Sequence, residues 1–249
     1  MRESPSLNRI YTGDCREVMA TWPAEGVGCI LTSPPYNIGL DYDGFNDNMP
    51  HGEFVEFNRQ WLIEAARVCR ETARIYVIVG RKMKWWFKPS AEAVGLNFVQ
   101  ELTWCKPNLV NSSRGMRYDW SPMTEPILLF RKGKRTPMLN AASILLSANT
   151  FDWFVETVPQ SNFREGRIHP AQLPLSLCQK IIARTPGEPV LDPFAGSGQV
   201  LRAAQSLGRS WIGIELVPSV AEAARRFIAA PNLPRVVEVS QMPLVLPAE

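Results

Sequence analysis

The chain has 249 residues, of which 45% are hydrophobic, and this length can bury one large α/β core. Its 27 Lys and Arg against 24 Asp and Glu leave a net charge of only +3. That balance excludes a strongly basic protein, so any face for an anionic partner must be local.

The N-terminal segment MRESPSLNRIYTGD has no apolar signal region, and no run approaches the roughly 18 apolar residues of a membrane helix. We therefore expect a cytoplasmic protein with no membrane partner. The first clear element is VGCILT (27–32), which predicts a buried strand. It ends at TSPPYNIG (32–39), where two prolines remove backbone donors, so a turn is expected at the carboxyl end of that strand.

Apolar residues at helical spacing predict a helix from Glu53 to Glu71, followed by a second buried strand, ARIYVIVG (73–80). Together with the first strand they imply a βαβ unit. Two further strands are predicted, LNFVQELTW (96–104) and EPILLFRKG (125–133). Between them, Pro107 to Pro122 reads as a long loop, and we interpret it as a lid or a partner-binding loop.

The last third of the chain alternates helices and strands. The predicted elements are a helix at Pro174 to Arg184, the strand PVLDP (189–193), a helix at Gln199 to Leu207, the strand SWIGIEL (210–216) and a helix at Ser219 to Ala229. This alternation indicates a doubly wound, mostly parallel α/β sheet with helices on both faces.

Residues 190–216 form a strand, a turn with glycines, a helix and a strand that ends in an acid. Gly196 and Gly198 let the backbone approach a ligand, and Glu215 is placed to accept ribose hydroxyls. The third glycine of a dinucleotide fingerprint is replaced by Leu201, which argues against a nicotinamide cofactor. A tight turn between strand and helix would by itself also explain the glycines.

Two other side chains favour a ligand at this turn. Asp192 suits a cationic amino-acid group, and Phe194 suits the flat face of a base. S-adenosylmethionine has both features, so it is the predicted cofactor.

The turn Ser33, Pro34, Pro35, Tyr36, here called the clamp, fits chemistry on the exocyclic amino group of a base. Such an amino group is a poor nucleophile because its lone pair is delocalised into the ring. The Ser33 hydroxyl and the Pro34 carbonyl can accept its two N–H bonds, and Tyr36 can stack on the base. The alternative is structural, with Ser33 capping a turn and Tyr36 in the core.

The motifs TSPPY, HPAQLP (169–174) and DPFAGSG (192–198) resemble, in this order, the β-group of amino-methylating DNA methyltransferases. The resemblance runs from IYTGD near residue 10 to GIEL near residue 215. It implies one Rossmann-like methyltransferase domain over residues 1–249. Within that domain it implies a catalytic block at 10–132, a short target-recognition insert at 133–166 and a cofactor block at 167–230.

The resemblance also assigns site residues. The catalytic turn is Ser33, Pro34, Pro35 and Tyr36, and the cofactor contacts are Asp14, Gln172, Asp192, Phe194, Gly196, Gly198 and Glu215. Serine before the two prolines is typical of cytosine-N4 enzymes in this family, with adenine N6 as the alternative target. The implied partner is double-stranded DNA, and a homodimer and a cognate restriction endonuclease are left open.

Cationic residues mark candidate DNA contacts. RKGKR (131–135) supplies Arg131, Lys132, Lys134 and Arg135, although a charge run is often only a solvated surface. The long loop adds Arg114 and Arg117. In RKMKWWFK (81–88) we expect at least one of Trp85 and Trp86 to lie in the core.

Other chemistries find little support. The five cysteines form no C-x-x-C pair with a nearby histidine, so reduced structural thiols are expected and no metal site. No cysteine follows a proline, which argues against attack on cytosine carbon 5, and AGSGQ lacks the first glycine of a hydrolase elbow. An RNA or protein methyltransferase normally has the opposite motif order. A catalytically silent nucleic-acid-binding protein and a nicotinamide dehydrogenase remain as alternatives.

Overall fold

The computed structural model describes residues 2–42, 45–108, 122–139, 151–159 and 172–230. Its main strands are β1 (Arg9–Thr12), β2 (Val27–Thr32), β5 (Cys69–Ile78), β6 (Asn97–Cys105), β7 (Thr124–Arg131), β8 (Trp153–Val155), β9 (Val190–Asp192) and β10 (Trp211–Glu215). They form one sheet in the order β1-β10-β9-β2-β5-β7-β6-β8. Only β7 runs antiparallel to its neighbours, so the predicted mostly parallel sheet is confirmed.

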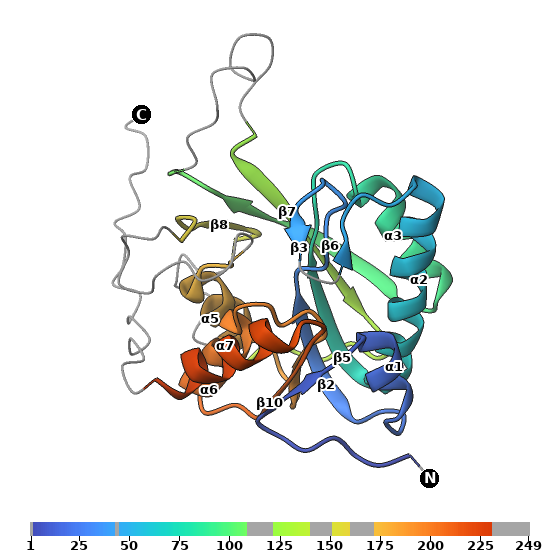
Figure 1. Ribbon diagram of the computed structural model, residues 1–249, viewed down its shortest axis with the longest axis vertical. Coiled ribbons are helices and arrows are strands. Elements are labelled where there is room, and N and C mark those ends of the chain that lie inside the picture. The colour runs from blue at the N-terminus through green and yellow to red at the C-terminus, as the bar shows by residue number, and fades with distance from the viewer. Residues whose placement is uncertain (1, 43–44, 109–121, 140–150, 160–171, 231–249) are drawn as a thin grey trace.

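Helices cover both faces of this sheet (Figure 1). The helices α1 (Cys15–Ala20), α2 (His51–Val68) and α3 (Lys84–Ala93) pack on one face and share one apolar cluster. The helices α5 (Leu175–Arg184), α6 (Gln199–Ser206) and α7 (Pro218–Ala229) pack on the other face around a second cluster. A small hairpin of β3 (Asp41–Tyr42) and β4 (Phe45–Asn46) lies between β2 and α2 in the chain. The doubly wound architecture expected from the sequence is therefore confirmed.

The winding of the chain changes direction between β2 and β9. From β2 the chain crosses through α2 to β5 on one side, and from β9 it crosses through α6 to β10 on the other side. The two strands are parallel neighbours, with Cys29 opposite Val190 and Ile30 opposite Leu191. Such a switch point opens a crevice at the carboxyl ends of the strands, which is where ligands bind in sheets of this kind.

Burial explains why these residues form these elements. All six residues of β2 are buried because the strand is central and both of its faces are covered. In α2, large apolar side chains recur on one face and pack into the first cluster. The predicted end of this helix at Glu71 is wrong, because Cys69 leaves helical geometry and pairs with Val27 at the start of β5. Pairing in the sheet overrides helical propensity at these residues.

The cysteines and the two adjacent tryptophans were also singled out in the sequence, and the expected core tryptophan is found only in part. All five cysteines are free thiols, and all except Cys105 are buried. Trp86 packs partly buried against the first cluster, while Trp85 is 77% exposed. Among the described residues, no helix is both long and apolar enough to cross a bilayer.

Gly28 offers a direct test of packing at the switch point. A Cβ atom there would lie 2.3 Å from the Glu188 backbone nitrogen, and backbone atoms cannot move aside. We predict that Gly28→Ala lowers the free energy of unfolding in urea by about 2 kcal/mol. The matched control is Gly26→Ala, whose Cβ would meet nothing within 4 Å. Equal unfolding curves for the two variants would contradict this packing.

Candidate active site

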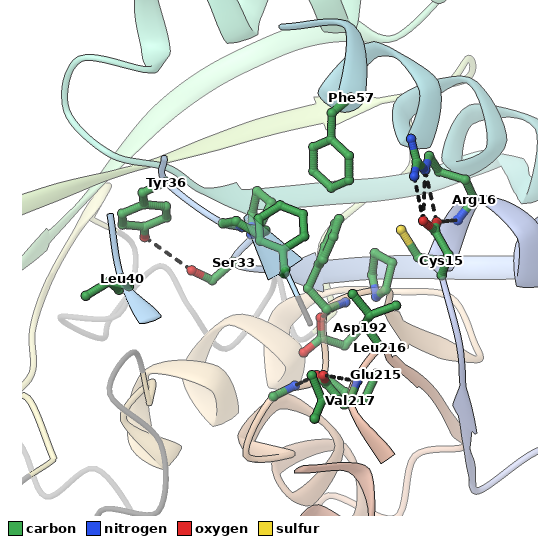
Figure 2. A pocket seen from close by; sticks show the side chains of 18 of the residues that line it. Cys15, Arg16, Ser33, Tyr36, Leu40, Phe57, Asp192, Glu215, Leu216 and Val217 are labelled. Atoms are coloured by element: carbon green, nitrogen blue, oxygen red, sulfur yellow. Dashed lines mark hydrogen bonds and ion pairs between the residues drawn. The ribbon is translucent and has the colours of Figure 1, made fainter. Parts of the chain in front are cut away.

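A cavity of about 790 Å³ opens at the carboxyl ends of β2, β9 and β10 (Figure 2). The clamp lines one part of it, and the turn Pro193–Gly198, here called the glycine turn, contributes five of its six residues to the wall, all except Gly198. Among the described residues, five acidic side chains line the cavity (Asp14, Glu53, Glu56, Asp192, Glu215), against one basic side chain, Arg16. The excess of carboxyl groups favours a cationic ligand.

A buried hydrogen bond joins the two sides of the cavity. The Thr32 hydroxyl donates to Asp192 Oδ1 over 2.7 Å, and the Phe194 backbone N–H donates to the same oxygen over 3.1 Å. Burial raises the pKa of Asp192 to about 7, although both hydrogen bonds favour the carboxylate. A cationic group bound beside Asp192 would shift it towards the charged form.

The glycine turn is held by Glu215. The Gly196 N–H donates to Glu215 Oε2 over 2.8 Å, and the Val217 N–H donates to Oε1 over 3.0 Å. Burial raises the pKa of Glu215. Each carboxyl oxygen keeps a lone pair for a further donor, such as a hydroxyl group. Gly198 caps the amino end of α6 with φ at 79°, a left-handed conformation that favours glycine.

Asp14 occupies the start of α1 and forms a compact ion pair with Arg16. The Arg16 guanidinium lies 2.6 Å from Asp14 Oδ2, donates to Gln60 over 2.6 Å and stacks over the Phe57 ring. Burial opposes ionisation of Asp14, but the hydrogen bonds from Arg16 hold its pKa below the ordinary value. A charged carboxylate therefore faces the cavity beside a cation that is already engaged.

The clamp is shaped by its own hydrogen bonds and by the ring of Tyr36. The Ser33 hydroxyl donates to the Tyr36 hydroxyl over 3.2 Å. The Tyr36 ring lies against Gly80, where an added Cβ would be 3.5 Å from the ring. Figure 2 shows Ser33 and Tyr36 on the opposite side of the cavity from Arg16.

A buried carboxylate fixes the chain that follows the clamp. Asp47 is 3% exposed and accepts hydrogen bonds from the backbone N–H groups of Asn37, Ile38 and Leu40, over 2.8, 3.1 and 3.0 Å. Asn37 has φ at 56°, and its side chain bonds to both the N–H and the carbonyl of Met49. The clamp is thus tied to the segment that leads into α2.

Most of the predicted site residues lie together. The cavity is lined by Asp14, Ser33, Pro34, Pro35, Tyr36, Asp192, Phe194, Gly196 and Glu215. Gln172 is buried next to Leu173, which also lines the cavity. Sequence reasoning missed Arg16 and one face of α2 (Glu53, Glu56, Phe57 and Gln60). Their helical spacing identifies a shared face, but not which neighbour that face meets.

The cationic run 131–135, which was predicted to contact DNA, does not line this cavity. Thr32, beside the clamp, pairs with Val77 of β5, whereas Arg131 pairs with Arg74 of the same strand. Arg74 is three residues closer to the amino end of β5 than Val77. The Lys132 ammonium donates to the Cys69 carbonyl over 2.8 Å and lies near two glutamates. Basic side chains of this region gather around a second cavity of about 370 Å³ on the α5 face: Arg74, Arg131, Lys134, Arg135, Lys180 and Arg184.

Two predicted features fall outside the described residues. Arg114 and Arg117 belong to 109–121, and much of the expected target-recognition insert belongs to 140–150 and 160–171. Their predicted roles stay predictions.

Comparison with known proteins identifies relatives over nearly the whole chain. The type II methyltransferase M.HpaI of Haemophilus parainfluenzae is 28% identical over 233 residues, which cover 87% of this chain and 73% of the relative. The type II methyltransferase M.BglII of Bacillus subtilis is 25% identical, covering 90% and 69%.

Solved structures share the fold. The cytosine-N4-specific PvuII DNA methyltransferase superposes with a TM-score of 0.76 at 18% identity, covering 93% of this chain and 90% of that one. A complex of M1.HpyAVI with S-adenosylmethionine gives 0.69 at 22% identity, covering 89% and 99%. Residues 27–226 match the family model described as DNA methylase, of the N6 and N4 type. The chain therefore belongs to this DNA methylase family.

Proposed function

We propose that this protein transfers a methyl group from S-adenosylmethionine to the exocyclic amino group of a base flipped out of duplex DNA. The observation that carries the proposal is the meeting of the clamp and the glycine turn in one cavity, joined by the Thr32–Asp192 hydrogen bond. Methyl transfer needs the acceptor nitrogen and the methyl donor within reach of each other, and two neighbouring strand ends provide that.

The residues around the glycine turn fit S-adenosylmethionine, which supplies an electrophilic methyl group when bound. Glu215 can accept the ribose hydroxyls, and Asp192 can pair with the ammonium group. The excess of acidic over basic lining residues suits a cationic sulfonium compound. It disfavours a nicotinamide dinucleotide, whose pyrophosphate would face five carboxyl groups. Relatives of the same fold have been solved with S-adenosylmethionine.

The clamp supplies the acceptor side of the reaction. The Ser33 Oγ and the Pro34 carbonyl accept the two amino hydrogens, which directs the nitrogen lone pair towards the methyl group. Flipping the base costs a few kcal/mol, and stacking on the Tyr36 ring offsets about 1 to 3 kcal/mol of this. This chain performs both tasks with four consecutive residues.

Cytosine N4 is the target that we propose. Ser33 resembles the serine of cytosine-N4 enzymes, and the PvuII enzyme, with the same fold, is cytosine-N4-specific. A carboxylate at this position would be a stronger acceptor, but a hydroxyl accepts the amino hydrogen adequately. Adenine N6 is the alternative target within the same chemistry.

Glu215 provides a test of the cofactor site. We predict that Glu215→Ala weakens S-adenosylmethionine binding by about 10- to 100-fold, because two hydrogen bonds to a charged acceptor are lost. Isothermal titration calorimetry measures this. The control is Glu222→Ala, which removes a carboxylate from the exposed side of α7. Unchanged affinity in the Glu215 variant would remove this residue from the ribose site.

The target base can be read directly from product DNA. We predict that DNA from a host expressing the protein contains N4-methylcytosine, measured by mass spectrometry of digested nucleosides. A host expressing Ser33→Ala should contain far less, because the acceptor for the amino hydrogen is gone. Finding only N6-methyladenine would refute cytosine as the target, but it would still support DNA methyltransferase activity. No methylated base of either kind would favour the silent binding protein.

Substitutions of basic residues around the second cavity test the predicted contacts with DNA phosphates. We predict that replacing Arg131, Lys134 and Arg135 with Gln lowers DNA affinity equally for all sequences and flattens its salt dependence by about one unit of slope per lost contact. Arg226→Gln, an exposed charge on α7, is the control. Lys132 is replaced separately, because its ion pairs at the start of β5 favour a role in stability. Loss of binding to one sequence only would mean that these residues read bases.

A further inference from the structure

A chain of hydrogen bonds leads from the clamp to a partly buried ion pair. The Ser33 hydroxyl donates to Tyr36, and the Tyr36 hydroxyl donates to Glu125 Oε2, each over 3.2 Å. The other carboxyl oxygen of Glu125 is bound by the ammonium group of Lys106. Neither Glu125 nor Lys106 lines the cavity, and no motif of the sequence pointed to them.

The chain of hydrogen bonds has a fixed direction. As a carboxylate, Glu125 can only accept, so the Tyr36 hydrogen must point to it. The Tyr36 oxygen then accepts the hydrogen of Ser33. Among the described residues, the hydrogen of the Ser33 hydroxyl is used in this hydrogen bond to Tyr36. The Ser33 Oγ therefore presents lone pairs, and no hydrogen, to a bound amino group.

The position of Glu125 is set by the sheet. Glu125 lies in β7 opposite Trp104 of β6, and the Lys106 N–H donates to the Met123 carbonyl over 2.7 Å. Lys106 is 8% exposed, and its ammonium lies 4.4 Å from the centre of the Trp104 ring. A side chain held in this way has little freedom to turn, so the acceptor stays aimed at Tyr36.

We propose that Glu125 is a positioning residue for methyl transfer, which acts through Tyr36 to keep the Ser33 hydroxyl an acceptor. The proposal rests on the function proposed above. A serine free to rotate would spend part of its time with its hydrogen towards the amino group, where two donors repel each other. Glu125 removes that orientation without touching the base or the cofactor.

Glu125→Gln tests this with almost no change in shape. The amide oxygen stays beside the Lys106 ammonium, because an NH₂ group there would meet another donor. The NH₂ group therefore replaces Oε2 and donates to Tyr36, which reverses the direction of the chain. The Tyr36 hydrogen is then free to turn to Ser33, whose own hydrogen is displaced towards the substrate.

The expected result is a loss that depends on the Tyr36 hydroxyl. We predict that Glu125→Gln lowers kcat by about tenfold, the effect of one ordinary hydrogen bond, while KM for S-adenosylmethionine stays the same. Tyr36→Phe keeps the stacking ring and should lower kcat by a smaller factor, about threefold. The kcat of the double variant should equal that of Tyr36→Phe and be higher than that of Glu125→Gln. Without the Tyr36 hydroxyl, the reversed hydrogen bond at residue 125 cannot reach Ser33.

The control is Glu101→Gln, which alters a comparable Lys–Glu pair, 3.0 Å from Lys84, on β6 and α3. It should leave kcat unchanged. A Glu125→Gln enzyme as active as wild type would overturn the proposal. So would a loss of kcat on adding Glu125→Gln to Tyr36→Phe that equals the loss in the wild-type background. So would loss of the folded near-ultraviolet circular dichroism spectrum in Glu125→Gln, which would assign the carboxylate to stability. A wild-type protein that methylates no DNA would instead refute the proposed function.

Discussion

The hydrogen bond from Thr32 to Asp192 joins residues 160 positions apart in the chain, and the geometry of the site depends on it. Thr32 immediately precedes the clamp, and Asp192 immediately precedes the glycine turn. Their strands are neighbours because the chain winds outwards in both directions from this point. A slip in register between β2 and β9 would therefore move the clamp away from the glycine turn, although both strands would stay folded.

The electrostatics of the cavity are arranged by backbone and buried groups more than by free charges. Glu215 accepts hydrogen bonds from two backbone N–H groups, and the charged Asp14 carboxylate forms an ion pair with Arg16. Asp192 is buried, and burial raises its pKa to about 7. The cavity therefore has three carboxyl groups in three different surroundings, and each can interact differently with a bound molecule.

The sequence predicted the strands and helices whose apolar pattern is long and continuous, such as Val27–Thr32. It missed β1, α1 and α3, because short elements and a helix carrying Pro89 among cations have weak periodicity. Motifs located the clamp and the glycine turn. They did not locate Arg16 or Glu125, because those side chains reach the site across the fold, and spacing along one element carries no record of such a contact.

The way Asp47 holds the residues after the clamp bears on how this site can evolve. The Asp47 side chain accepts its three hydrogen bonds from backbone N–H groups, which every amino acid except proline possesses. The side chain of Ile38 is 65% exposed and contributes nothing to this anchoring. Substitutions of Ile38 can therefore change the exposed surface next to the clamp while the backbone hydrogen bonds that hold the clamp stay in place.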